Sequence, residues 1–145
     1  MWSDRYIGVK YDFYSRNIEC GANCLTLLLA ILKDEFGYDA HMNVACLSED
    51  WYKVKPAQMI EEAVKRGEVI KNISDLRAGD LVFFKITEEF VNHMGMMVDD
   101  YDNFIHQLKD QTSRLDKTKH AVWSQLFFCG IRLSEVYEKL HTATV

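Results

Sequence analysis

The sequence has little proline and little glycine, and it has no long apolar run. One proline and seven glycines stand among 145 residues, which indicates few irregular stretches and a single domain over residues 1–145. No apolar run approaches the roughly 20 residues that a membrane-spanning helix needs, so we expect no membrane insertion. The first residues, M-W-S-D-R-Y-I-G-V-K-Y, hold no apolar segment before a small-residue cleavage site, and we therefore expect no secretory signal.

Paired cysteines and a basic surplus are also missing. None of the four cysteines, Cys20, Cys24, Cys46 and Cys129, belongs to a C-x-x-C pair, which disfavours a structural zinc site. Hydrophobic residues make up 48% of the chain, enough for a core without a disulfide framework, so we expect free thiols and synthesis in the cytoplasm. A net charge of −5 argues against nucleic acid as the main partner.

The strongest local pattern is a helix that opens on a cysteine. The segment from Asn23 to Gly37 reads N-C-L-T-L-L-L-A-I-L-K-D-E-F-G, and its apolar run is too broad for a surface helix. Asn23 suits the N-cap and Gly37 suits the stop. Cys24 then lies in the first turn, where the helix dipole and free backbone N–H groups favour an anion. We therefore predict a lowered pKa for Cys24 and a nucleophilic thiolate.

The rest of the chain predicts an α+β fold. The first 22 residues look mostly irregular. The following elements are expected: an amphipathic helix over 56–66, a turn and strand over 76–86, strands over 92–98, 104–107 and 126–133, and a closing helix over 134–141. Strands separated by short turns pair antiparallel. The order predicts the Cys24 helix packed on a mostly antiparallel sheet.

Two of the five histidines fall on one predicted hairpin. His93 begins its strand and His106 ends the partner strand, so antiparallel pairing brings the two rings together. A cysteine nucleophile needs such a base and a third polar group that orients the base. From the residues alone, two unrelated surface histidines remain an alternative, as does a zinc site formed with Cys24. The acidic turn over 99–103 leaves calcium as a further, weaker alternative, without EF-hand spacing.

At these positions the sequence resembles the NlpC-type cysteine peptidases, papain-like hydrolases of the bacterial cell wall. The shared elements follow in the family's order: Gly8-Val9-Lys10-Tyr11, Asn23-Cys24, Phe36-Gly37, then Gln58, Gly67 and Val69, the L-x-x-G-D-L-V-F-F run over 76–84, His93-Met94-Gly95-Met96-Met97, Phe104-Ile105-His106, and Trp123, Gly130 and Arg132. A related CHAP-type amidase usually lacks the F-I-H element, so that class fits less well.

The resemblance implies a role for each matching residue. Cys24 is implied as the nucleophile, His93 as the base and His106 as the third polar residue, and the N–H of Cys24 helps to bind the oxyanion. Tyr11 and Asn23 are implied to bind substrate. No cofactor or metal is needed. The implied substrates are peptide stems of peptidoglycan, often cut between D-γ-glutamate and a diamino acid.

Departures from the family pattern surround the cysteine. Asn23 stands where the family has Asp, and Leu25-Thr26 replaces the common Ser-Gly, which leaves the cleaved bond open. Tyr14 and Ser15 replace the usual glycines and are expected to narrow one side of the cleft. Cys20 competes as nucleophile but lies outside the helix.

Four other residues carry weaker expectations. Cys129 falls in an apolar strand and should be an inert core residue. His120 and His141 should face solvent, and His41 should lie in a loop.

The missing signal and the bare domain favour a bacteriophage tail protein that opens the wall during infection, with other tail proteins as partners. An intracellular peptidase that recycles wall peptides is the enzymatic alternative. A structural tail protein that keeps the fold without catalysis is the alternative from another class.

Overall fold

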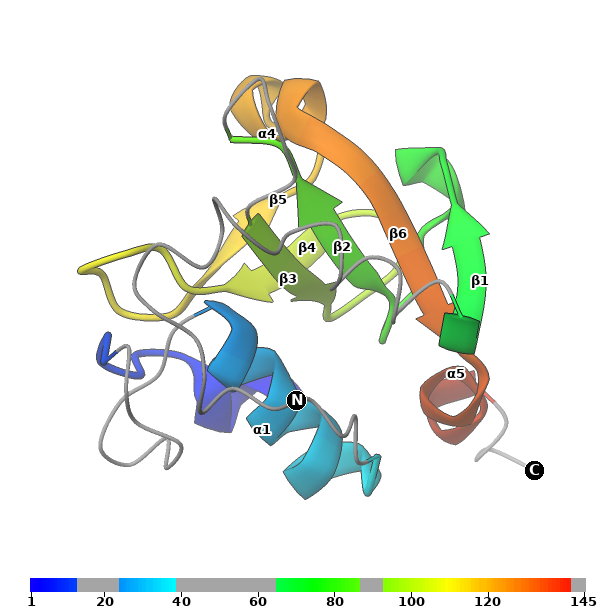
Figure 1. Cartoon of the computed structure of the whole chain (residues 1–145), viewed down its shortest axis with the longest axis horizontal. Coiled ribbons are helices and arrows are strands. Elements are labelled where there is room, and N and C mark those ends of the chain that lie inside the picture. The colour runs from blue at the N-terminus through cyan, green and yellow to red at the C-terminus, as the bar shows by residue number, and fades with distance from the viewer. Residues whose placement is uncertain (13–23, 39–64, 87–92, 142–145) are drawn as a thin grey trace.

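The computed structural model describes residues 1–12, 24–38, 65–86 and 93–141 (Figure 1). Its elements are η1 (Trp2–Tyr6), α1 (Cys24–Phe36), β1 (Gly67–Ile70), η2 (Ile73–Asp75), β2 (Leu81–Phe84), β3 (His93–Met97), β4 (Asn103–His106), β5 (Arg114–Lys117), α4 (Ala121–Leu126), β6 (Phe127–Leu133) and α5 (Ser134–His141). The predicted α+β fold, with a cysteine-bearing helix on an antiparallel sheet, is confirmed. None of the helices in these ranges is long and apolar enough to span a bilayer.

Helix α1 has the bounds that the sequence predicted. It begins at Cys24 and ends at Phe36. Gly37 follows with a φ of 64°, a conformation that glycine adopts without the steric cost of a Cβ, and its N–H donates to the carbonyl of Lys33 at 3.0 Å. This bond closes the helix. The predicted N-cap, Asn23, lies outside the described residues.

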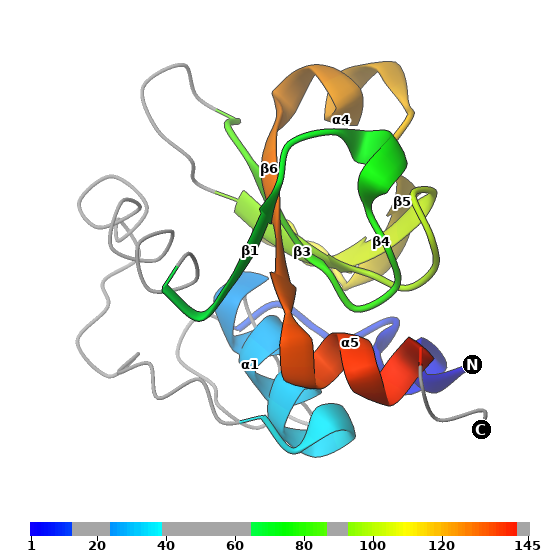
Figure 2. The ribbon, with the colours of Figure 1, turned by 90° about the vertical axis from the view of Figure 1, so that its right-hand side faces the viewer.

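The six strands form one antiparallel sheet in the order β1-β6-β2-β3-β4-β5. Figure 2 shows this sheet edge-on, strongly curved, with α1 and α5 side by side below it. The predicted hairpin is β3 with β4, and Gly95 lies opposite His106 in its register. The edge strands β1 and β5 and the short helix α4 were not predicted. Residues 2–6 form a 3-10 helix where an irregular segment was expected.

The predicted helix over 56–66 lies almost wholly outside the described residues. Its last two residues, 65 and 66, are helical. Strand β1 begins immediately afterwards at Gly67, one residue beyond the predicted end of that helix.

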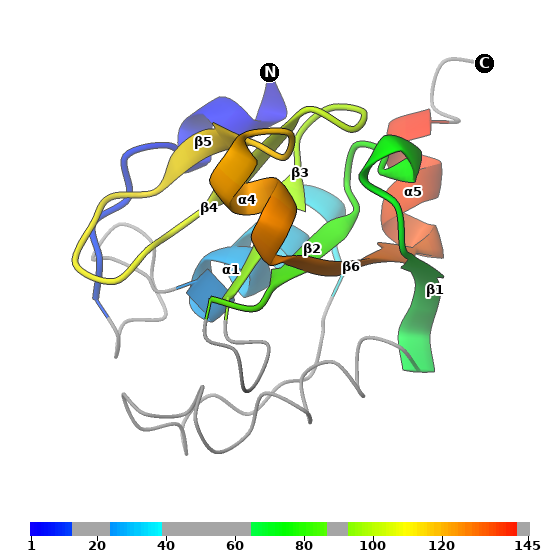
Figure 3. The same ribbon diagram turned by 90° about the horizontal axis from the view of Figure 1, so that it is seen from above.

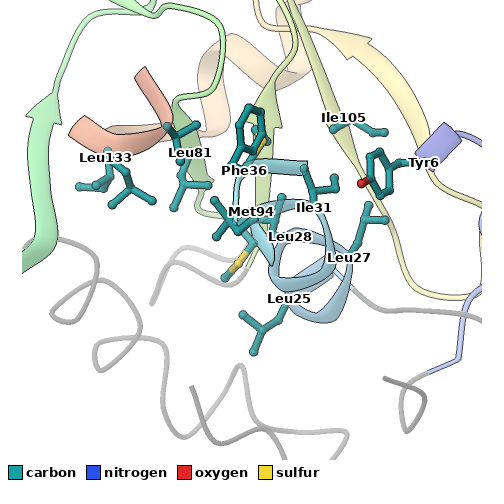
Figure 4. Close-up of a cluster of buried hydrophobic side chains, with 14 of the residues drawn as sticks. Tyr6, Leu25, Leu27, Leu28, Ile31, Phe36, Leu81, Met94, Ile105 and Leu133 are labelled. Carbon is teal, nitrogen blue, oxygen red and sulfur yellow. The ribbon is translucent and has the colours of Figure 1, made fainter. Parts of the chain in front are cut away.

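One hydrophobic core lies between α1 and the sheet (Figure 4). In that view, Leu27, Leu28 and Ile31 of α1 point toward Met94 of β3 and Ile105 of β4. The apolar breadth of α1 is explained by this burial, since sheet, α5 and η1 all pack around it. Each fully buried Leu or Ile contributes about 1.5–3 kcal/mol relative to an exposed one.

A second core covers the other face of the sheet. Its members are Ile70, Leu76, Val82, Phe84, Met97, Phe104 and Trp123. Figure 3, seen from the side of α4, shows α4 in front of the sheet and α1 behind it. Side chains alternate along a strand, so His106 shares this face with Phe104, two residues earlier. The paired histidines therefore lie beneath α4, within an aromatic layer.

A buried ion pair fixes the turn before β2. Asp80 is 1% exposed, and its carboxylate accepts two bonds from Arg132, from Nε at 3.0 Å and from Nη2 at 2.8 Å. The N–H of Arg77 donates to the same carboxylate at 2.8 Å. Two hydrogen bonds from one guanidinium to one carboxylate are strong and directional. Asp80 of the G-D-L-V-F-F run and Arg132, two residues after Gly130, are therefore structural partners that tie this turn to β6.

Candidate active site

The two hairpin histidines meet in the interior. Nε2 of His93 lies 2.7 Å from Nδ1 of His106, a hydrogen-bond distance. Both side chains are buried, at 3% and 1% exposure. The predicted juxtaposition is thus found, and the alternative of two unrelated surface histidines is wrong.

The hydrogen-bonded chain continues to a carboxylate that the sequence analysis missed. Nε2 of His106 lies 2.7 Å from Oδ2 of Asp116, and Nε of Arg114 donates to the same oxygen at 2.9 Å. Asp116 belongs to β5 and lies opposite Phe104 in the register. The run Arg114-Leu115-Asp116-Lys117 is too short and too polar to stand out as a strand. With one apolar residue among four, the run offers no alternation from which a strand could be predicted.

An aromatic shell surrounds both imidazole rings. Trp123 lies with its ring centroid 4.8 Å from that of His106 and 5.8 Å from that of His93. Phe84 is 6.0 Å from His93 and Phe104 is 4.6 Å from His106. Trp123, which the resemblance placed only in a terminal motif, is therefore part of the site and excludes water from it.

Burial in this shell keeps both rings neutral. It lowers the pKa of His93 well below its ordinary value of 6.5, and the neighbouring His106 lowers it further. Burial also lowers the pKa of His106, although the carboxylate of Asp116 opposes that effect. At neutral pH each ring thus carries one proton, on one of its two nitrogens.

Cys24 is the first residue of α1, with a half-buried side chain. Its sulfur is within hydrogen-bonding reach of the backbone N–H groups of Met94, Leu25 and Cys24 itself. Met94 directly follows His93, so the thiol lies against the start of the strand that carries the base. Among the described residues, no hydrogen bond joins this thiol to the His93 ring, and none occupies Nδ1 of His93. The hydrogen bond between the two histidines therefore does not use Nδ1 of His93, the nitrogen that would accept a proton from a nucleophile.

The predicted low pKa of Cys24 is wrong for the protein without substrate. Burial raises the pKa of the Cys24 thiol to about 12, and the backbone N–H groups of Met94, Leu25 and Cys24 only partly offset this. The helix terminus does favour the anion, but desolvation in a half-enclosed site is the larger effect. Thiol and imidazole are both neutral at rest.

The segment that carries Tyr11 is tied to the strand end beyond His106. Gln107, the residue after His106, donates through Nε2 to the carbonyl of Val9 at 2.8 Å. Ser113 accepts from the N–H of Val9 through Oγ at 2.8 Å, and its own N–H donates to the carbonyl of Val9 at 2.9 Å. Tyr11 follows, half-buried, and packs against the same core as Cys24. Its predicted substrate contact stays a prediction.

The remaining candidates are distributed as follows. Asn23, Cys20, Cys46, His41, Tyr14 and Ser15 lie outside the described residues. Cys129 is buried in the core as predicted, and burial raises the pKa of its thiol to about 11. His120 is exposed and accepts from the N–H of Val122 at 3.3 Å. His141 is not fully solvent-facing as expected, because Nε2 donates to the carbonyl of Ala78 at 3.1 Å.

The part of the chain that the structure describes holds no group of three or more His, Cys, Asp and Glu side chains arranged to bind a metal ion. His93 and His106 point their facing nitrogens at each other instead. A hydrogen-bonded pair of this kind suits proton transfer.

The fold resembles solved structures of NlpC/P60 family proteins. One is a lipoprotein-like NLP/P60 family protein from Staphylococcus aureus, with a TM-score of 0.60 and 18% identity over 91% of this chain and 39% of that one. Another is the NlpC/p60 domain of the peptidoglycan hydrolase SagA, with a TM-score of 0.59 and 15% identity over 91% and 93% of the two chains. A third is an NlpC/P60 family protein from Bacillus cereus, with a TM-score of 0.61 and 18% identity over 88% and 36%.

This chain thus spans well under half the length of two of those three proteins. No curated protein matches it in sequence. Fold and site together define an α+β domain with a cysteine at the start of a buried helix and a hydrogen-bonded histidine pair on the adjoining sheet. The sequence profile of the NlpC/P60 family matches residues 8–132, and the chain belongs to that family.

Proposed function

We propose that the protein is a cysteine peptidase that hydrolyses peptide stems of peptidoglycan. The observation that carries this proposal is the buried hydrogen bond of 2.7 Å between His93 and His106, on the strand against which Cys24 lies. Membership of the NlpC/P60 family and the likeness to the domain of a peptidoglycan hydrolase support the choice of substrate class.

Each group has a proposed role in acyl transfer. As Sγ of Cys24 attacks the carbonyl carbon, Nδ1 of His93 takes the thiol proton. The negative charge moves to the carbonyl oxygen, where the backbone N–H of Cys24 donates to it. Protonated His93 then gives its proton to the leaving amine as the C–N bond breaks. Water, deprotonated by the same imidazole, attacks the thioester and releases the acid and the thiol.

The neutral resting state determines the order of these events. A thiol whose pKa is about 12 does not ionise ahead of attack at neutral pH. Attack and proton transfer must therefore be coupled, which makes the orientation of the His93 ring decisive. His106 supports the imidazolium that forms on His93, in the way that the third member of a triad does.

The proposed bond is the one between D-γ-glutamate and a diamino acid. The Leu25-Thr26 departure bears on this choice, and both side chains are buried, at 2% and 8% exposure. They therefore alter the packing behind Cys24 more than the surface that meets a substrate. This supports a substrate of the family's ordinary class.

The proposed setting is a bacteriophage tail, in which the enzyme opens the wall locally during infection. This part of the proposal is separate from the chemistry. Detection of the protein by peptide mass spectrometry in purified virions supports it. Its absence from the particles, with cleavage of free stem peptides, points to wall-peptide recycling instead.

The function is tested by incubating purified stem peptides with the protein and identifying the products by mass spectrometry. We expect cleavage by the wild type and by Cys20→Ala, and no cleavage by Cys24→Ala. Cleavage that persists in Cys24→Ala, or no cleavage of any stem by the folded wild type, contradicts the proposal. The second outcome favours a tail protein that has kept the fold without catalysis.

A further inference from the structure

We propose that Asp116 is a positioning residue that sets the tautomers of both histidines, so that His93 presents an unprotonated Nδ1 to the thiol. The inference rests on the proposed function only in taking His93 as the base. The tautomers themselves follow from the hydrogen-bonded chain.

The series of hydrogen bonds from Asp116 through His106 to His93 begins at a group that can only accept, the carboxylate of Asp116. An ionised carboxylate has no proton to donate, so the contact of 2.7 Å between Oδ2 of Asp116 and Nε2 of His106 requires the proton on Nε2. His106 is neutral, so its Nδ1 must then carry a lone pair. That lone pair faces Nε2 of His93 at 2.7 Å, and Nε2 of His93 must be the donor. Neutral His93 is left with a lone pair on Nδ1.

The opposite arrangement disables the base. If Nδ1 of His106 carried the proton, it would donate to Nε2 of His93. The remaining proton of neutral His93 would then lie on Nδ1, where no proton can be accepted from Cys24. One carboxylate, two rings away from the thiol, therefore decides whether the base works.

Asp116 is held in its charged form by its neighbours. Burial acts to raise the pKa of Asp116, but hydrogen bonds from His106 and Arg114 outweigh burial and leave the pKa below its ordinary value. Arg114 is itself held by Gln111, whose Oε1 accepts from Nη1 at 3.0 Å. Lys117, the next charged residue on β5, is paired with Asp102 at 3.3 Å. The carboxylate of Asp116 therefore stays ionised, and can only accept hydrogen bonds, throughout the neutral pH range.

The geometry makes it possible to test whether Asp116 acts as a hydrogen-bond acceptor or through its negative charge. His106 and Arg114 both donate to the same oxygen, Oδ2 of Asp116. An asparagine can place its carbonyl oxygen at that point and accept from both donors, although it carries no charge. A leucine of similar shape offers no acceptor. The Asn variant should therefore preserve the tautomers, and the Leu variant should lose them.

The test reads the tautomers directly and needs no substrate. Nitrogen-15 NMR of the imidazole rings separates protonated from unprotonated nitrogens. In the wild type and in Asp116→Asn we expect His93 with its proton on Nε2. In Asp116→Leu we expect a mixture of tautomers at both rings. Asp102→Leu is the matched control, since it removes an exposed carboxylate bound to Lys117 and should leave both rings unchanged.

Cleavage of stem peptides supplies the second readout. We expect kcat/KM to fall roughly tenfold in Asp116→Leu, the size expected for the loss of one charge-assisted hydrogen bond, and to be largely retained in Asp116→Asn. A role limited to the ion pair with Arg114 would predict equal loss in both variants. Such equal loss overturns the inference, as does a proton on Nδ1 of His93 in the wild type. The expected tautomers without any cleavage would instead refute the proposed function and leave this inference standing.

Discussion

The indole of Trp123 lies edge-on against the imidazole of His106, with ring centroids 4.8 Å apart and ring planes at 85°. The same indole lies 5.8 Å from His93 at 32°. One side chain from α4 thus covers both rings of the pair, and it does so from a helix of six residues. A helix that short is held by its packing rather than by its own hydrogen bonds.

Trp123→Ala should destabilise the protein and should also let water reach the imidazole rings of His93 and His106. We expect a loss of about 3–5 kcal/mol in the free energy of unfolding, as for other large-to-small core changes. Water that enters the cavity should raise the pKa of His93 toward its ordinary value of 6.5, since burial is what lowers it. Chemical denaturation and NMR titration of His93 measure the two effects. Trp123→Phe is the control, and a full effect in Phe would contradict this account.

The neutral histidines make the fold sensitive to acid. Burial lowers the pKa of both His93 and His106 in the folded state, whereas the unfolded chain titrates near 6.5. The unfolded state therefore binds more protons below that pH, and stability should fall as pH falls from about 6.5 toward the folded-state values. Urea denaturation at pH 8, 6 and 5 measures this slope.

The matched control for the acid effect is His120, which is exposed. We expect His120→Gln to leave the slope unchanged and His93→Gln to flatten it. A wild-type stability that does not change between pH 8 and pH 5 would show that the two rings are not held neutral by the fold.

The resting thiol should react slowly with alkylating agents. Because burial raises the pKa of Cys24 to about 12, only a small fraction is thiolate at pH 7. The rate of Cys24 modification by iodoacetamide should keep rising up to pH 10 without a plateau. Mass spectrometry of timed digests assigns the label, with Cys24→Ala as the blank. A rate already constant between pH 5 and pH 8 would instead indicate a preformed thiolate–imidazolium pair.

Much of this architecture could be read from the sequence. Periodicity and a glycine stop gave both ends of α1, because a buried helix is apolar over most of its surface. The hairpin of β3 and β4 followed from two apolar runs around a polar turn, and its pairing predicted the contact between His93 and His106. These features depend on local pattern, which a single sequence records.

The rest depended on contacts between distant segments. Strand β1 and strand β5 lie at the two edges of the sheet among the described residues. Each is only four residues long, and β5 holds a single apolar residue, so neither shows a clear strand pattern. Asp116 was missed for this reason. The pKa of Cys24 was misjudged because the helix terminus is visible in the sequence, while the burial that outweighs it comes from the fold.

The ion pair of Asp80 and Arg132 should contribute far more to the free energy of unfolding than an exposed ion pair does. Removing Asp80 deletes both hydrogen bonds from Arg132 and leaves that partly buried guanidinium without its carboxylate; breaking a buried pair in this way typically costs about 3–5 kcal/mol. We expect Asp80→Ala to lose stability in that range while the folded fraction retains its histidine pair. Asp102→Ala, which removes an exposed pair with Lys117, should cost less than about 1 kcal/mol. Urea denaturation of the two variants compares them, and equal losses would contradict the structural role of Asp80.

A substitution at Gly95 tests whether the close approach of β3 and β4 sets the geometry of the site as well as the stability of the fold. It lies opposite His106, and a Cβ at this position would meet the carbonyl oxygen of Ile105 at 2.7 Å and a ring carbon of Phe104 at 2.9 Å. Gly95→Ala must therefore push β3 away from β4, which stretches the hydrogen bond between His93 and His106. We expect a stability loss of about 1–3 kcal/mol from overpacking, together with a loss of cleavage of at least roughly tenfold, since proton transfer tolerates little misplacement.

Gly37→Ala is the comparison for that variant. Its φ of 64° makes alanine unfavourable by about 1 kcal/mol, but the position closes α1 far along the helix from Cys24. Cleavage per folded molecule should then be normal in Gly37→Ala and reduced in Gly95→Ala, with both measured where each variant is fully folded. If the two variants lose activity only in proportion to their unfolding, the close approach at Gly95 serves packing alone and the spacing of the histidines does not depend on it.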